Sequence, residues 1–382
     1  MPQTKKYSPS PPQTHLPMQI KPDTSSSWSL CFFNNKGGVG KTTLACNIAS
    51  QLARKNNLRV LLVDADPQCN ATQLILSDSQ TETLYESGKI EANEFKYEVD
   101  TLKDVLSPIV AGEATLKTRF SMVDAKTNRF GIDLLPGHPE IALLEDKLSQ
   151  NWSSLISGDL GGARVTNWNT QLLRHLQGKY DLIVYDVGPS LGALNRAVLV
   201  GVDFFLAPMG CDIFSLIGIN NIAAWLRDWQ DVYTQGLSQC NKRHREAMMH
   251  YEIKKSEASM CRFIGYTVQQ YITKTIRKER RATGAYEEIL KSIPGRITER
   301  LGPLTALGLS NKDLRLGDVP HMFSLVPLAQ TAHAPIDGLT GKDGLSGGQF
   351  GQQTDYQTFI SELSDSMLRN LRKVQSNQVK NQ

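Results

Sequence analysis

The chain has 382 residues, a formal net charge of +4, 40% hydrophobic residues and 21% charged residues. This is a globular composition, and it excludes a mainly disordered, collagen-like or disulfide-scaffold protein. The length is enough for two domains or for one large α/β domain with insertions, and no stretch approaches the roughly 18 consecutive apolar residues of a transmembrane helix.

Residues 1–27 hold six of the chain's 17 prolines, with Ser and Thr between them and little apolar periodicity. We expect a disordered tail there. The N-terminus lacks the apolar core of a secretory signal, which favours a cytoplasmic protein. The cysteines show no CxxC pair and no neighbouring histidine pair, so we expect reduced, mostly packed thiols. They are Cys31, Cys46, Cys69, Cys211, Cys240 and Cys261.

The sequence changes character after this tail. Residues 28–34 form a short apolar run that ends in a Gly-rich turn, and residues 58–66 form a second apolar run that ends in acidic residues. Between them, residues 42–54 place their apolar side chains on one helical stripe. The stripe consists of Leu44, Ile48, Ala49 and Leu52. Strand, loop, helix and strand in this order predict the βαβ unit of a parallel sheet.

Further candidate strands follow along the chain. They lie at residues 130–136, 180–186, 202–208 and 262–268. Helical patterns lie between most of them. This alternation predicts an α/β fold with a doubly wound, mostly parallel sheet and helices on both faces.

Some segments fit this alternation less well. Residues 73–129 are polar and weakly periodic, and we expect helices and loops over the edge of the sheet. Residues 338–352 carry six glycines, which predicts a mobile surface loop. Residues 356–373 have apolar residues at helical spacing, and residues 376–382 form a polar tail.

The sharpest feature is NNKGGVGKTT at residues 34–43, between a predicted strand and a predicted helix, as a phosphate-binding loop requires. Its glycines allow the backbone to curl so that successive N–H groups converge on phosphate oxygens. The helix that begins near Lys41 adds its positive end. Lys41 would lie against the β- and γ-phosphates, the Thr42 hydroxyl would be a Mg²⁺ ligand, and Thr43 would bond the α-phosphate.

The loop departs from the common pattern GxxxxGK[ST] at Asn35, where that pattern has glycine. A second lysine, Lys36, stands directly before the glycine pair. The spacing KGGxGK[ST] is expected by chance in under about one chain in ten thousand of this length, which disfavours a turn without a ligand. The sequence therefore predicts a nucleotide site.

These residues resemble the motif of the ParA/MinD family of deviant Walker A ATPases, KGGVGKTT, at residues 36–43. LLVDADPQCNAT at residues 61–72 is similar to the family's second acidic motif, with Cys69 where glycine is usual, and it favours the ParA branch over MinD. YDLIVYDVGPSLGALN at residues 180–195 is similar to the family's Walker B segment, with Gly188 where proline is common.

Residues 319–330 resemble the late sheet strand of ParA-type partition proteins. The resemblance covers residues 28–233 well and the remainder loosely. It implies one ParA-like ATPase domain over residues 28–375, with insertions near residues 73–129 and 235–285.

The resemblance implies ATP and Mg²⁺ as ligands. Lys36 would reach across a dimer interface to the phosphates bound by the partner chain. Asp66 would position or activate the attacking water, and Asp186 would hold Mg²⁺ through water. Asp64 would support the same metal-side network, or it would be a strand-end cap or ion-pair partner. The implied phosphate-binding set is Lys36, Gly37, Gly38, Val39, Gly40, Lys41, Thr42 and Thr43, with Lys36, Lys41 and Asp66 catalytic and Thr42, Asp64 and Asp186 at the metal.

A basic region lies in the C-terminal half. Residues 237–300 carry 14 Lys or Arg against seven Glu, and the densest run is at residues 275–284. Such a run can contact the phosphates of duplex DNA without reading sequence, and ParA-type dimers bind DNA through basic residues in this half. A solvated helix face is the alternative interpretation. The candidate DNA contacts are Arg277, Lys278, Arg280 and Arg281.

We therefore expect an ATPase that forms a homodimer around two ATP molecules, turns over slowly and is stimulated by a partner such as a ParB-like protein. Its expected purpose is the partition or positioning of DNA or of a DNA-bound cargo, with nucleoid association if DNA binding holds. The alternative is a MinD-like ATPase that cycles on a membrane through a C-terminal amphipathic helix, for which residues 356–371 offer an apolar stripe. A terminal helix packed back onto the sheet explains that stripe with fewer assumptions.

Overall fold

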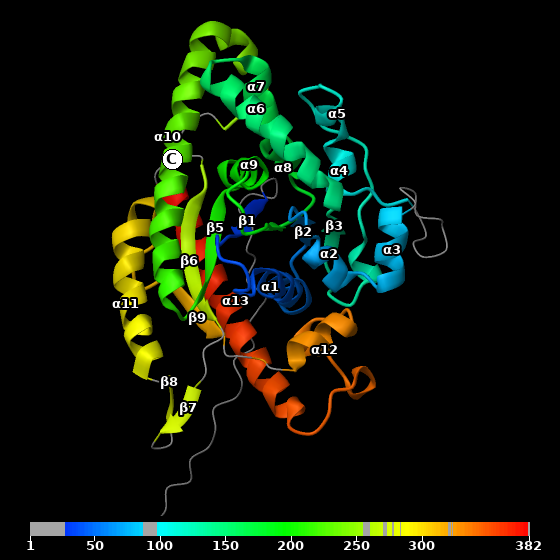
Figure 1. Ribbon diagram of the computed structural model, residues 1–382, viewed down its shortest axis with the longest axis vertical. Helices are drawn as coiled ribbons and strands as arrows, with labels where there is room; N and C mark the ends of the chain where they lie inside the picture. Colours follow the sequence, from blue (N-terminus) through cyan, green and yellow to red (C-terminus); the bar gives the residue numbers. More distant parts are fainter. Residues whose placement is uncertain are drawn as a thin grey trace, which may run out of the picture.

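A seven-stranded parallel sheet organises the molecule (Figure 1). The computed structural model describes residues 27–86, 98–254, 260–269, 273–276, 279–282, 284–319, 322 and 324–380. The sheet order is β3-β2-β4-β1-β5-β6-β9, and every pairing is parallel. Its strands are β1 (Trp28–Phe32), β2 (Val60–Asp64), β3 (Asp133–Leu135), β4 (Leu182–Asp186), β5 (Phe204–Gly210), β6 (Arg262–Gln269) and β9 (Arg315–Val319).

Helices cover both faces of this sheet, which confirms the predicted fold class. The first half of the chain contributes α1 (Lys41–Asn56), α2 (Asn70–Ile75), α3 (Asp78–Glu86), α4 (Leu102–Val105), α5 (Ser107–Val110), α6 (Leu144–Ile156), α7 (Leu160–Thr166) and α8 (Trp168–Leu176). The second half contributes α9 (Ala193–Gly201), α10 (Ile213–Met248), α11 (Gly284–Leu301), α12 (Leu325–Thr331) and α13 (Gln349–Lys380). A separate antiparallel ribbon pairs β7 (Thr273–Ile276) with β8 (Glu279–Ala282).

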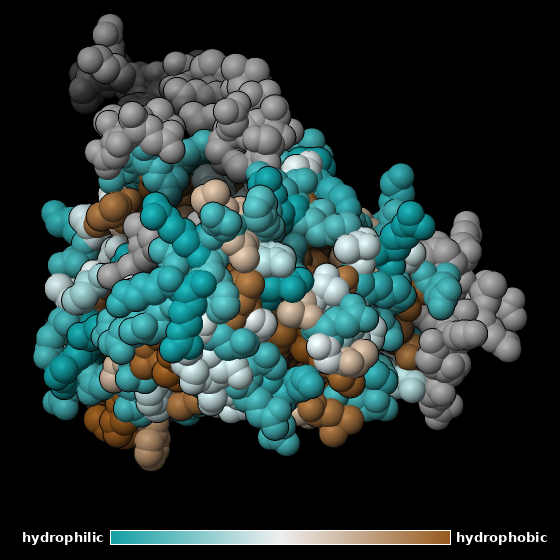
Figure 2. Space-filling model, turned by 90° about the horizontal axis from the view of Figure 1, so that it is seen from above, coloured by the Kyte–Doolittle hydropathy of each residue, from teal (hydrophilic) through white to brown (hydrophobic). Residues whose placement is uncertain are grey.

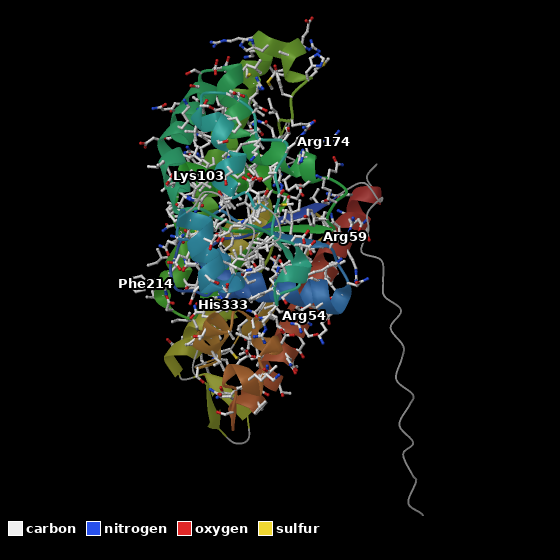
Figure 3. The ribbon with its side chains drawn as sticks, turned by 90° about the vertical axis from the view of Figure 1, so that its right-hand side faces the viewer. Arg54, Arg59, Lys103, Arg174, Phe214 and His333 are labelled. Carbon is white, nitrogen blue, oxygen red and sulfur yellow. The ribbon has the colours of Figure 1, made fainter. Side chains whose placement is uncertain are left out.

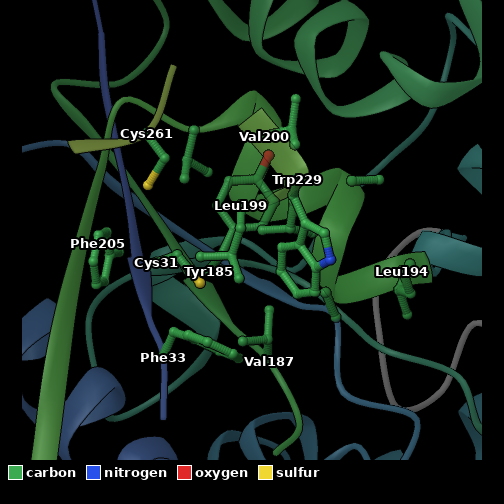
Figure 4. Packing of buried hydrophobic residues seen from close by; sticks show 14 of the residues in the cluster. Cys31, Phe33, Tyr185, Val187, Leu194, Leu199, Val200, Phe205, Trp229 and Cys261 are labelled. Carbon is green, nitrogen blue, oxygen red and sulfur yellow. The ribbon is translucent and has the colours of Figure 1, made fainter. Parts of the chain in front are cut away.

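Alternate residues of the strands enter two different apolar clusters, because successive side chains of a strand point to opposite faces. On one face, residues such as Cys31 and Tyr185 pack with α6, α8, α9 and α10, as Figure 4 shows for Trp229 of α10. On the other face, residues such as Leu30 and Val184 pack with α1, α2, α12 and α13. β1, β2 and β4 are buried along their whole length, as expected of central parallel strands.

The surface seen from above in Figure 2 is mainly hydrophilic, with apolar residues scattered over it. No helix in the described part of the chain is long and apolar enough to cross a membrane. All six cysteines lie in that part and are buried free thiols, as predicted.

The late strand differs from its predicted position. β9 ends at Val319, the first residue of the predicted segment, and Leu325–Thr331 is the helix α12. Leu325 and Ala329, four residues apart, are the buried positions of α12, and this spacing is helical. The strand itself lies at Arg315–Val319, with Leu316 and Val319 buried, Gly317 and Asp318 half-buried and Arg315 exposed.

The glycine-rich segment at residues 338–352 is more regular than the predicted loop. It contains a 3₁₀ turn at Gly341–Asp343, and α13 begins at Gln349. Arg129 holds the turn, because its guanidinium donates to both carboxylate oxygens of Asp343 at 2.7 and 2.9 Å and to the carbonyl of Gly338 at 2.9 Å. The number of glycines in the segment cannot reveal these hydrogen bonds to Arg129, which lies about 200 residues earlier in the sequence.

The predicted terminal helix is present and longer than expected. α13 runs to Lys380, so it includes most of the predicted polar tail at residues 376–382. Its apolar stripe packs against β9 and α1, which confirms that the helix lies back on the sheet. The buried residues of the stripe are Tyr356, Ile360, Leu363, Met367, Leu368, Leu371 and Val374.

The segment at residues 73–129 contains α3, α4 and α5, as expected, and it meets the edge strand β3 through an antiparallel bridge between Val123 and Leu134. The insertion predicted near residues 235–285 begins as the continuation of α10 to Met248. The predicted tail, apart from residue 27, lies outside the described residues.

Candidate nucleotide site

The predicted phosphate-binding loop connects the end of β1 to the start of α1. Gly38 and Gly40 have φ of 72° and 71°, in the left-handed region that glycine adopts without strain. A Cβ built on Gly37 or Gly38 would meet none of the described atoms within 4 Å, so this loop faces open space. No side chain in the described residues caps α1 at Gly40, and the first-turn N–H groups are therefore available to an anion.

The open space is a cavity of about 620 Å³, a size that suits a nucleotide. One wall is the phosphate loop and the start of α1. The rest of the lining comes from three other parts of the chain: Asp66, Gln68, Asn70, Gln73, Leu74 and Asp78 after β2, Pro189 after β4, and Gln330, Thr331 and His333 at the end of α12. The carboxyl ends of parallel strands, the usual ligand edge of a doubly wound sheet, thus form the cavity.

Lys41 lies in the cavity wall with only 7% of its surface exposed. Its ammonium donates to the carbonyl of Lys36 at 3.1 Å. Burial lowers the pKa of Lys41, and the carboxylates of Asp186 and Asp66 oppose that change. A buried cation with few partners, beside a helix N-terminus, is well placed to neutralise a phosphate.

Asp186 ends β4 and is fully buried. Within the described residues neither carboxylate oxygen has a partner in hydrogen-bond geometry. Burial and the neighbouring Asp64 raise the pKa of Asp186 well above its ordinary value, while the nearby Thr42 hydroxyl opposes the shift. An unpartnered buried carboxylate next to a Thr hydroxyl fits one side of a Mg²⁺ site, because Mg²⁺ takes hard oxygen ligands.

Asp64 ends β2 directly opposite Asp186 in the register of the sheet, yet its environment differs. One oxygen accepts from the Thr72 backbone N–H at 2.8 Å and from the Thr72 hydroxyl at 2.7 Å, and the other accepts from the Asp66 N–H at 3.2 Å. Burial raises the pKa of Asp64 to about 6, against these hydrogen bonds. The geometry matches the strand-end cap among the roles considered for Asp64.

Asp66 lines the cavity with 6% of its surface exposed. Its Oδ1 accepts from the Gln68 N–H at 3.0 Å. A Cβ on Gly188 would lie 3.0 Å from the same oxygen, so the turn after β4 packs directly against this carboxylate. Cys69, the departure from glycine in this motif, has φ of 54°, which explains why glycine is usual at that position.

Lys36 lies at the rim of the cavity rather than in its lining. Its Nζ is 2.5 Å from Oδ2 of Asp212, the residue that caps α10 by accepting from the Ser215 N–H at 3.0 Å. Phe214, in the first turn of α10, is 67% exposed and projects from the molecule in Figure 3, with its ring 6.0 Å from the Lys36 ammonium. Val39, by contrast, is buried, so it contributes only backbone to the loop.

The structure therefore brings together the loop residues 37–43, Asp66 and Asp186, with Lys36 beside them. Among the described residues no cluster of three or more His, Cys, Asp or Glu could hold a metal alone. The predicted DNA contacts are elsewhere: Arg280 and Arg281 belong to β8, whereas Arg277 and Lys278 lie outside the described residues.

Sequence reasoning missed the distant parts of the lining. Gln330, Thr331 and His333 reach the cavity from the C-terminal part of the chain, and no motif marks them. Asp212 was also missed, although its place four residues after the predicted strand at residues 202–208 could have pointed to the ligand edge of the sheet.

The fold and this site define an α/β P-loop NTPase. A family model described as an AAA domain matches residues 28–239, more than half of the chain. A protein of Corynebacterium diphtheriae of known structure is 32% identical, with a TM-score of 0.63, over 80% of this chain and 97% of that chain. The chain belongs to the ParA-type P-loop ATPase family.

Relatives named for chromosome partitioning match about half of the chain. ParA of Myxococcus xanthus is 30% identical over 55% of this chain and 60% of its own length. ParA of Caulobacter vibrioides is 32% identical over 50% of this chain and 60% of its own length. The chain thus spans about 60% of the length of these relatives. The structure of apo McdA from Cyanothece has a TM-score of 0.54 at 14% identity, and this likeness concerns the fold alone.

Proposed function

We propose that the protein is a Mg²⁺-dependent ATPase of ParA type that hydrolyses ATP to ADP and phosphate and uses the reaction as a switch. In its ATP state it forms a homodimer and binds nonspecific DNA, for the partition of a plasmid or chromosome or the positioning of a cargo. The observation that carries this proposal is one cavity lined by the start of α1, Lys41 and Asp66, with Asp186 beside it. Among the described residues no side chain caps α1, and the Asp186 carboxylate has no partner in hydrogen-bond geometry.

Phosphoryl transfer asks the protein mainly to position groups and to neutralise charge. Lys41 and the start of α1 would bind the phosphate oxygens. Asp66 would accept a hydrogen bond from the attacking water through Oδ2, since within the described residues only Oδ1 has a hydrogen-bond donor. Thr42 and Asp186 would hold Mg²⁺ together with oxygens of the nucleotide, and the bound ion would neutralise phosphate charge.

A second copy of the chain fits the rim of the cavity. Exposed apolar side chains lie in the first turns of α10, next to Asp212 of the Lys36–Asp212 pair, and their burial would stabilise a dimer. They are Ile213, Phe214 and Ile217, with exposed fractions of 56%, 67% and 48%. To reach the partner's phosphates, Lys36 would have to leave Asp212 and pair with the nucleotide instead. Because only a bound nucleotide replaces the lost partner, the dimer would depend on ATP.

The β7–β8 ribbon supports the DNA contact. It holds two of the predicted contacts, Arg280 and Arg281, within residues 237–300, which carry 14 Lys or Arg against seven Glu. Basic residues of this kind bind the phosphates of duplex DNA without sequence recognition. The membrane alternative is not favoured, because the apolar stripe of α13 is already buried against β9 and α1.

The test is phosphate release and DNA binding by the purified chain with ADP, ATP or a non-hydrolysable analogue, at low and high salt. We expect slow Mg²⁺-dependent hydrolysis that Lys41→Ala abolishes, and DNA binding only with ATP or its analogue. Binding should weaken steeply with salt and fall in Arg280→Ala/Arg281→Ala. An inactive wild-type chain would overturn the ATPase proposal, and an active chain that binds no DNA would overturn only the DNA part.

A further inference from the structure

A carboxylate from α6 caps the N-terminus of α9, the helix that follows the Walker B turn. Glu145 accepts from the Ala193 N–H at 2.5 Å, and its two oxygens lie 3.3 and 3.4 Å from the Leu194 N–H. A Cβ at Gly192 would clash with Oε1 of Glu145, so a side chain there would displace the carboxylate. Charge-assisted bonds of this kind at a helix N-terminus are among the stronger ones in proteins.

The two helices are also joined one turn further along. The guanidinium carbon of Arg196 in α9 lies 4.2 Å from the centre of the Trp152 ring in α6. Burial lowers the pKa of Arg196, and the charge of Glu145 opposes that shift, so the carboxylate serves both the helix end and the guanidinium. α6 therefore fixes both the position and the direction of the first turns of α9.

The first turn of α9 also positions the Walker B turn, which is the segment at residues 187–192 between β4 and α9. Asn195 is 1% exposed, and its side-chain amide donates to the carbonyls of Gly188 and Ser190, both at 2.8 Å. Any displacement of the start of α9 is thus passed to Gly188.

Gly188 is the residue that packs against Asp66. Its Cβ position lies 3.0 Å from Asp66 Oδ1, and Pro189, the next residue, lines the nucleotide cavity. A continuous set of contacts thus leads from Glu145 through α9 and Asn195 to the carboxylate expected to orient water.

We propose that Glu145 is a positioning residue for the ATPase reaction, which holds Asp66 in place through α9 and the Walker B turn. This inference rests on the proposed function. A positioning residue differs from an ordinary helix cap in what its loss changes: loss of an ordinary cap would lower stability without a specific effect on turnover. Asp159 is such a cap in the same half of the molecule: it accepts from the Gly162 N–H of α7 at 2.6 Å and is not part of the cavity lining.

The experiment compares Glu145→Ala with Asp159→Ala for kcat, KM, ATP affinity and thermal unfolding. We expect Glu145→Ala to lower kcat about tenfold with ATP affinity within about twofold of wild type, because a misplaced catalytic group affects the reaction more than binding. Asp159→Ala should lower the unfolding temperature by a similar amount and leave kcat unchanged. Glu145→Gln, which keeps one acceptor oxygen, should fall between wild type and Glu145→Ala.

A double variant provides the second readout. In an Asp66→Ala chain the positioned group is gone, so adding Glu145→Ala should lower the residual kcat no further. An equal fall in both backgrounds, or a Glu145→Ala chain that behaves as Asp159→Ala does, would overturn the inference while the ATPase proposal stands. If Glu145→Ala does not fold, Glu145→Gln carries the same comparison. A wild-type chain without ATPase activity would instead overturn the proposed function itself.

Discussion

The ends of β2 and β4 make an instructive comparison. Each strand ends in a fully buried aspartate, Asp64 and Asp186, and the two residues are partners in the sheet register. Asp64 has every oxygen engaged by Thr72 or by the Asp66 backbone, whereas Asp186 has no partner in hydrogen-bond geometry among the described residues. Because an unsatisfied buried carboxylate is costly, the contrast supports our proposal that Asp186 binds a ligand, and it favours a capping role for Asp64.

The largest expected effect is on activity at Asp186. Asp186→Asn should reduce Mg²⁺-dependent hydrolysis on the order of a hundredfold, since it removes the charge that would face the metal. Without nucleotide, the same variant should be as stable as wild type or more stable, because it replaces a buried carboxyl group whose ionisation is costly in that position. The measurements are steady-state phosphate release and denaturant unfolding of both proteins. A variant that is both destabilised and fully active would reverse the roles assigned to the two aspartates.

Asp64 should show the opposite behaviour. Asp64→Asn should lower the free energy of unfolding by about 3 kcal/mol, because an amide cannot accept from all three donors and turns its own N–H₂ toward one of them. Thr72→Ser is the matched control: it keeps the hydroxyl that donates to Asp64 and should cost no more than about 1 kcal/mol. Equilibrium unfolding in urea measures both. If both variants lose the same free energy of unfolding, the hydrogen bonds that Asp64 accepts are not the cause of the destabilisation.

The pH dependence of stability sharpens the comparison further. The pKa of Asp64 is raised in the folded state to about 6 from an ordinary 3.8, so the folded chain takes up this proton more readily than the unfolded chain. Stability from this group is therefore gained as the pH falls from about 6 to about 4, and is absent above pH 6. Relative to Asp64→Asn, wild type should gain on the order of 2 kcal/mol over that range.

The quantity to measure is the free energy of unfolding of wild type minus that of Asp64→Asn, because other carboxyl groups titrate over the same range in both proteins. The buffer should contain no metal and no nucleotide. If this difference stays constant or decreases as the pH is lowered from 7 to 4, the pKa of Asp64 is not raised.

The local parts of the site were predictable from the sequence, and the distant parts were not. The loop at residues 36–43 and the two acidic strand ends can be identified because each motif is contiguous and lies at a strand end. Whether Asp64 faces a metal or caps its strand could not be decided, since that depends on Thr72, eight residues away. The role of Glu145 was not foreseen, because it acts on residue 193 through a contact that leaves no periodic signal.

The same reasoning explains the misplaced late strand. An apolar run at residues 319–330 suits a strand or a buried helix, and only the packing of Leu325 and Ala329 decides between them. The fold class of the sheet could be predicted from the alternation of elements along the chain. The order of its seven strands could not, because the sequence does not show which strands are neighbours.

The packing of α13 on α1 has a consequence for how the chain is made. These helices cover the same face of the sheet, yet they are separated by about 300 residues of sequence. During synthesis the apolar side of α1 and its strands therefore stays uncovered until nearly all of the described chain has left the ribosome. Late packing between segments far apart in the sequence slows folding and leaves aggregation-prone apolar surface exposed. We therefore expect newly made chains to depend on chaperones.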